Sequence, residues 1–257
     1  MPPVHDDAVC IRQWEWSETS QTVSLFCRDL GLVRALAKGA RRPKAPYSGG
    51  VEILTRGDAG VILKPSSEMA LLTEWDLLEQ FPALRRSLDA HYAGLYMAEL
   101  IHYAVHDHDP HPALYASLLD ALRSLDEDLA RRTALLNFQW AILVETGYRP
   151  EINTDVRTGE PLAPAPSYRF SPSLGGLIPD KASPGEANGA WRVRRETIEL
   201  LARLPLQPGP HSGSTENHPA GREPIDRAGR LLAAYLRYVL GREPRMLPYL
   251  YDRQIPR

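Results

Sequence analysis

The chain has 257 residues, of which 43% are hydrophobic and 24% are charged, and its net charge is −2. This length can bury a core without disulfides, and the composition is typical of a globular protein. A slightly acidic chain has no global positive field, so any affinity for nucleic acid has to come from a local patch.

The first 76 residues show the apolar and polar alternation of β-strands. Five or six short strands separated by glycine turns predict a small closed barrel or sandwich. Within this region the Gly-Asp-Ala-Gly stretch at 57–60 is typical of a hairpin turn. The predicted strands are residues 8–15, 22–27, 32–37, 51–54, 61–63 and 69–75.

From residue 77 the hydrophobic spacing becomes helical. Leu77, Leu78 and Phe81 are expected to open this region, and Gly147 is a C-terminal stop signal for the helix predicted at 128–146. The predicted helices are residues 87–105, 113–125, 128–146, 190–204 and 224–240.

Two stretches lack a periodic pattern. Residues 148–187 are rich in Pro, Gly, Ser and Thr and predict an irregular lobe, while residues 207–223 are polar and turn-rich. The predicted domains are a barrel at 1–76, a first helical part at 77–147, the irregular lobe at 148–187 and a second helical part at 188–257.

Five cations and no acid lie between residues 34 and 44 of this slightly acidic chain. They leave a predicted strand and enter a Gly/Pro loop, where cations can line one face of a barrel and neutralise phosphates. The alternative is a basic loop that only keeps an exposed turn soluble. The candidate DNA contacts are Arg34, Lys38, Arg41, Arg42 and Lys44.

Several motifs in this order resemble the RecO family of recombination mediators. The N-terminal ones are SETS at 17–20, LF at 25–26, LG at 30–31 and AKGARR at 37–42. The later ones are YMAEL at 96–100, FQWAIL at 138–143, ETGYRP at 145–150 and the final helix and tail at 235–250.

The resemblance implies an α+β protein with an N-terminal OB-fold barrel, then a helical domain with an inserted zinc-finger-like lobe. It implies binding of single- and double-stranded DNA, strand annealing, and loading of RecA onto DNA coated by single-strand-binding protein, together with RecR. Lys38, Arg41 and Arg42 match the family motif, whereas Arg34 and Lys44 are included by proximity alone. No catalytic residue is implied.

The lobe departs from the family pattern of two C-x-x-C pairs. Those positions hold Asp155, Thr158, Pro179 and Ala182, of which only Asp155 could be a ligand. Structural zinc needs four good ligands, so we expect the lobe to have no metal and the protein to have no cofactor. Packing is expected to replace the metal, through Tyr168, Phe170 and Leu177.

Two other functions stay open. One is a protein-interaction adaptor in a repair complex with only secondary DNA contact. The other is a metal-dependent hydrolase, because His102 and His106 are spaced i, i+4 and could share a helical face. The histidine-rich segment also contains His108, His111, Asp107 and Asp109, and a solvated helix end is the favoured explanation for it.

The chain has five tryptophans and two cysteines. We expect most tryptophans to be buried, with Trp14 or Trp16 exposed for base stacking, since both cannot face inward on one strand with Ile11. Cys10 and Cys27 are expected to be reduced and buried. Without a signal peptide or a membrane-length apolar stretch, a cytoplasmic, nucleoid-associated protein is predicted.

Overall fold

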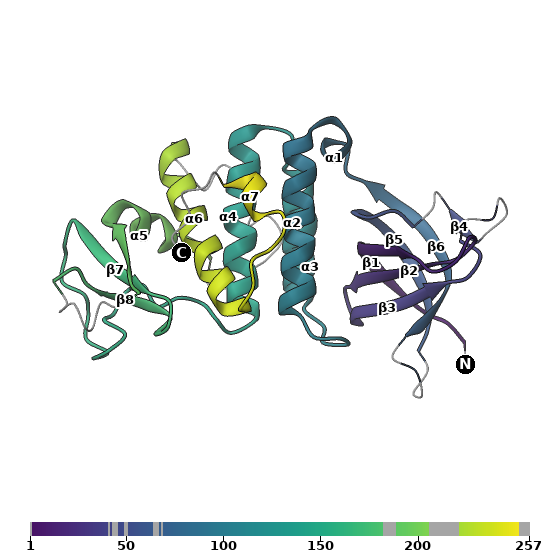
Figure 1. Cartoon of the computed structure of the whole chain (residues 1–257), viewed down its shortest axis with the longest axis horizontal. Helices are drawn as coiled ribbons and strands as arrows, with labels where there is room; N and C mark the ends of the chain where they lie inside the picture. The colour runs from purple at the N-terminus through teal and green to yellow at the C-terminus, as the bar shows by residue number, and fades with distance from the viewer. Residues whose placement is uncertain are drawn as a thin grey trace.

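A β-barrel lies at one end of the molecule, helices form the middle, and a small sheet lies at the other end (Figure 1). The computed structural model describes residues 2–40, 42, 46–48, 51–63, 67, 69–181, 189–205 and 221–251. This is an α+β fold with an OB-like N-terminal barrel, as predicted. The division into four domains stays a prediction.

The barrel has five main strands in the order β3-β2-β1-β5-β6, and a parallel pairing of β3 with β6 closes it. A short sixth strand, β4, pairs with β6. The closed order is that of an OB-like barrel and leaves its main strands without free edges. The strands are β1 (Val4–Glu15), β2 (Gln21–Cys27), β3 (Gly31–Ala37), β4 (Tyr47–Ser48), β5 (Thr55–Ile62) and β6 (Ala70–Gln80).

The hairpin turn predicted at 57–60 is wrong, because these residues lie inside β5. A Cβ on Gly57 would lie 2.5 Å from the Trp75 ring, and one on Gly60 would lie 2.6 Å from the Glu74 side chain. The two glycines therefore permit close cross-strand packing, a role that glycine often has within strands. The actual turn is at 51–54, which was predicted as a strand and where Leu54 has a φ of 59°.

Residues 77–80 were predicted to begin the helical region, but they extend β6. They pair with β5, where Leu77 lies opposite Gly57 and Glu79 opposite Arg56. The stretch of apolar residues that suggested a helix was too short to distinguish the helical period of 3.6 residues from the strand period of two. Phe81 follows the strand and is buried in the helical core.

The helices predicted in the middle of the chain are confirmed within one or two residues. Ser87 caps α2 by accepting a hydrogen bond from the backbone N–H of Ala90 at 3.3 Å. No helix in the described ranges is long and apolar enough to cross a membrane. The helices are α1 (Ala83–Arg86), α2 (Leu88–Ala104), α3 (Pro112–Arg123), α4 (Asp128–Glu145), α5 (Arg195–Leu201), α6 (Arg222–Leu240) and α7 (Leu247–Leu250).

The lobe contains a three-stranded sheet in the order β8-β7-β9. Strands β7 (Ser167–Ser171) and β8 (Gly176–Pro179) lie in the stretch predicted to be irregular. Residues 190–204 were predicted as one helix, but strand β9 (Trp191–Arg194) occupies the start of this range. Only α5 (Arg195–Leu201) is helical within it. The polar, turn-rich segment at 207–223 lies mostly outside the described residues.

Packing holds the lobe together, as expected. Phe170 and Leu177 are fully buried and Tyr168 is buried. The Phe170 ring makes an edge contact with Tyr235 of α6 at a centroid distance of 5.0 Å, and it stacks on Trp191 at 5.8 Å. These contacts join the lobe to the helical domain.

The barrel has its own interior, and its outer surface joins the helical core. Cys10 and Cys27 are buried inside the barrel as free thiols, and burial raises the pKa of Cys10 to about 12. The outward residues of β1 to β3 instead pack on the helices. These residues are Val9, Ile11, Phe26 and Leu32.

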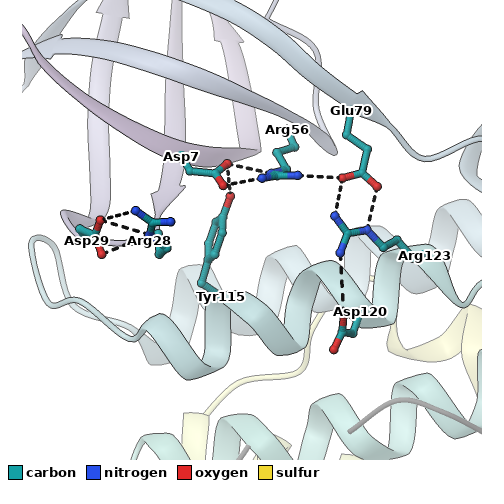
Figure 2. Close-up of polar contacts among 8 residues, drawn as sticks. All are labelled: Asp7, Arg28, Asp29, Arg56, Glu79, Tyr115, Asp120 and Arg123. Carbon is teal, nitrogen blue, oxygen red and sulfur yellow. Dashed lines mark hydrogen bonds and ion pairs between the residues drawn. The ribbon is translucent and has the colours of Figure 1, made fainter. Parts of the chain in front are cut away.

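A polar network fixes the same junction (Figure 2). Arg56 forms a two-pronged ion pair with Asp7 at 2.8 and 2.6 Å, and the Tyr115 hydroxyl donates to Asp7 at 2.7 Å. Glu79 accepts from Arg56 at 3.2 Å and from Arg123 at 2.8 and 2.7 Å. Strands β1, β5 and β6 are thereby bound to α3, which sets the orientation of the barrel.

Candidate nucleic-acid interface

Strand β3 presents cations on its outer face. Val33, Ala35 and Ala37 point into the barrel and are fully buried, whereas Arg34 and Lys38 are exposed. Side chains two and four residues apart on a strand share a face. The alternation therefore places both cations on one side of the barrel wall.

The loop after β3 continues this basic edge. Gly39 has a φ of 67°, its N–H donates to the Ser20 hydroxyl at 3.1 Å, and its carbonyl accepts from the N–H of Arg42 at 2.9 Å. A Cβ on Gly39 would lie 3.3 Å from the Arg42 side chain, so the glycine lets Arg42 fold back beside Lys38. Arg41 and Lys44 lie outside the described residues.

Arg34 is in a different environment from Lys38 and Arg42. Its guanidinium lies 3.3 Å from the carboxylate of Asp107, which follows α2. The backbone N–H of His108 donates to the carbonyl of Leu32 at 3.0 Å and holds this segment against β3. Arg34 is half exposed and already paired, so it is the weaker phosphate contact of the three.

The sequence prediction missed Arg12, which lies on the same face. In the sheet register Arg12 and Arg34 both lie opposite Ser24, and the guanidinium of Arg12 covers the Trp14 ring at 4.7 Å. Trp14 is 41% exposed, so its exposure is confirmed. The alternation Arg12-x-Trp14 on a predicted strand was the available signal.

Trp16 continues this aromatic edge beyond the end of β1 and is 62% exposed. Trp75 and Trp140 are buried, as expected for most tryptophans. Exposed indole rings next to arginines can stack on bases, since every base has a π face.

His102 on α2 is partly buried near Arg12 and Arg34. Burial first, and then the charges of these two arginines, lower its pKa to about 4, although Asp107 opposes them. The imidazole is therefore neutral at pH 7, and the two arginines add a local positive field. Such a field favours an anionic ligand.

The histidine cluster does not form the helical pair that a metal site would need. Helix α2 ends at Ala104, so His106 lies beyond it and cannot share a helical face with His102. His111 instead lies 3.4 Å from Glu145 and 3.2 Å from Asp109. Among the residues described, no group of three or more His, Cys, Asp or Glu could hold a metal ion.

The potential ligand in the lobe is also occupied. The carboxylate of Asp155 accepts hydrogen bonds from the backbone N–H of Arg157 at 3.0 Å and from its guanidinium at 3.0 and 2.7 Å. These hydrogen bonds outweigh burial and lower the pKa of Asp155. Asp155 stands where the family pattern has the first cysteine, and here its carboxylate stabilises a turn. A metal-free lobe stays a prediction.

Comparisons with known proteins cover both halves of the chain. The family model described as Recombination protein O N terminal matches residues 1–81, and Recombination protein O C terminal matches residues 85–248. The DNA repair protein RecO of Rhodopirellula baltica is 32% identical, over 96% of this chain and 98% of that protein. The DNA repair protein RecO of Desulforudis audaxviator is 31% identical, over 97% of each.

Proposed function

Because this chain belongs to the RecO family of DNA repair and recombination proteins, we propose that it binds single- and double-stranded DNA and anneals complementary strands. The observation that carries this proposal is the outer face of the barrel, where Lys38 and Arg42 are exposed and where Trp14 is exposed on β1, across β2 from β3. Members of this family are recombination mediators and not enzymes, so the protein makes and breaks no bond.

The mechanism is charge neutralisation. Two DNA strands repel each other through their phosphates, and cations on one rigid face reduce that repulsion by displacing condensed counterions. The DNA contacts are Lys38, Arg41 and Arg42, with Arg34 and Lys44 at the margin. Exposed tryptophans add base stacking, which tolerates any sequence.

Strand annealing at varied salt tests the proposal. The full-length protein should speed the pairing of two complementary labelled oligonucleotides. If about three to five phosphates are contacted, log K should fall against log salt with a slope of about −2 to −5. A protein that binds neither strand, or whose binding ignores salt, would contradict the phosphate model.

The partners follow from the same role. The protein works with RecR and single-strand-binding protein to load RecA onto coated DNA, in the cytoplasm at the nucleoid. A pulldown with RecR and single-strand-binding protein, with and without nuclease, tests this assignment. Capture of partners by a protein that fails to anneal DNA would favour an adaptor instead.

A further inference from the structure

Three arginines from distant parts of the chain converge where the barrel meets the helical domain. Arg12 and Arg34 lie in β1 and β3, and Arg242 directly follows α6. Arg12 and Arg34 flank Ser24 in the sheet. The guanidinium of Arg242 covers Tyr103 on α2, and Tyr103 lines the same cleft as Arg12, so Arg242 lies near this pair.

Aromatic rings hold two of these arginines. The guanidinium of Arg12 lies 4.7 Å from the centre of the Trp14 ring, and that of Arg242 lies 4.7 Å from the centre of the Tyr103 ring. In the ranges that the structure describes, neither arginine forms an ion pair with a carboxylate. A guanidinium that lies over a ring keeps its N–H edge available for a phosphate.

A cleft lies next to these two pairs, and one member of each, Arg12 and Tyr103, lines it. Its volume is about 190 Å³. A dry cavity of about 150 Å³ holds benzene, so this cleft has room for one planar ring. Its walls are mainly apolar and it is lined by Ile11, Arg12, Ile53, Leu95, Glu99, Tyr103, Arg245 and Met246.

The charges around the cleft favour different parts of a ligand at different places. Arg12 and Arg245 lie among its lining residues, whereas Glu99 accepts a hydrogen bond from the backbone N–H of Met246 at 3.0 Å. The carboxylate of Glu99 disfavours an acidic group inside the cleft. A neutral planar base can enter, while its phosphate remains with the arginines.

We propose that Arg12, Arg242 and Tyr103 form a subsite selective for single-stranded DNA. The guanidiniums hold a backbone phosphate, and one unpaired base enters the cleft beside Tyr103. A base in a duplex is stacked and paired and cannot enter without being flipped out. This subsite rests on the proposed function and adds strand selectivity to the barrel face, where Lys38 and Arg42 contact phosphates of either form.

Fluorescence anisotropy of the full-length protein with a labelled oligo-dT strand and a labelled duplex of equal length tests the subsite. Arg242→Ala and Tyr103→Leu should each weaken oligo-dT binding about fivefold or more, and duplex binding by less than about twofold. Tyr103→Phe keeps the ring and should bind like the wild type. Arg203→Ala removes an exposed charge after α5, in the lobe at the far end from the barrel, and should have no effect.

Two results would overturn the subsite while leaving DNA binding intact. They are unchanged oligo-dT affinity in Arg242→Ala and Tyr103→Leu, and an equal loss of affinity for oligo-dT and duplex. A wild-type protein that binds neither DNA would instead refute the proposed function itself.

Discussion

The barrel and the lobe differ in how several of their cations are paired. In the lobe sheet Arg192 lies 3.2 Å from Asp180, and in the adjoining helix α5 Arg195 lies 2.7 Å from Glu199. On the barrel, Lys38 and Arg42 have no carboxylate partner among the residues described. The local partner of a cation, more than the number of cations, decides whether it can serve a ligand.

The largest expected effect tests whether the lobe is a structural unit. Phe170→Ala removes a fully buried ring at the junction of β7 and α6. The free energy of unfolding, measured with urea, should fall by about 3–5 kcal/mol. A chelator should leave the wild-type transition unchanged, because we expect packing to replace the metal. Zinc bound in stoichiometric amount by the purified protein would contradict this account.

Removing the available cations gives the next effect. Lys38, Arg41 and Arg42 replaced together by Ala should weaken DNA binding on the order of a hundredfold at 0.1 M salt and reduce the salt slope by about 2–3. All sequences should be affected alike. The matched control replaces Arg192, Arg194 and Arg195, whose charges are paired. Similar losses in both triple variants would break the comparison.

Paired arginines at the junction should matter for stability instead of binding. Arg56→Ala should lower the free energy of unfolding by about 2 kcal/mol, because it leaves Asp7 half-buried without its main partner. Duplex DNA affinity should stay unchanged in the same anisotropy assay. A loss of affinity without a loss of stability would place Arg56 in the DNA contact.

The same network predicts a pH dependence. Burial raises the pKa of Asp7, but hydrogen bonds from Arg56 and Tyr115 outweigh it, and hydrogen bonds from Arg123 lower the pKa of Glu79. Unfolded carboxyls titrate near pH 4. Their contribution is therefore complete above this value and is lost as pH falls through the lower folded pKa values. Urea unfolding from pH 6 to 3 should show a flatter decline in Arg56→Ala.

The smallest expected effect comes from freeing a paired cation. Asp107→Asn removes the carboxylate beside Arg34 and should tighten DNA binding by about twofold to fivefold, with a salt slope steeper by up to about 1. Asp180→Asn in the lobe should have no such effect. Weaker binding in Asp107→Asn would mean that Asp107 positions Arg34 for its ligand.

Local periodicity was sufficient to predict most of the fold. Strands β1 to β3 and the three long helices α2 to α4 each repeat one pattern over enough residues to fix its period. The turn predicted at Gly57 to Gly60 was wrong because these glycines make room for side chains on β6. Strand β6 lies further along the chain, so the residues around the glycines do not indicate this packing. Strand β9 was missed because four residues run directly into α5.

The candidate site was predictable only where it follows one strand. Arg34 and Lys38 lie on the face that alternation along β3 implies. Arg12, Tyr103 and Arg242 come together from β1, α2 and the segment after α6. Their proximity depends on how the barrel docks on the helices, and a single sequence carries no local signal for that docking.

The absence of a Cβ on Gly57 has one more consequence. It admits Trp75, which is fully buried, into the middle of the barrel. Many barrels hold a guest inside, but here an indole already occupies that space. The barrel is a solid block, so it can offer a ligand only its outside, and a larger residue at position 57 should disturb its shape before it touches any contact with DNA.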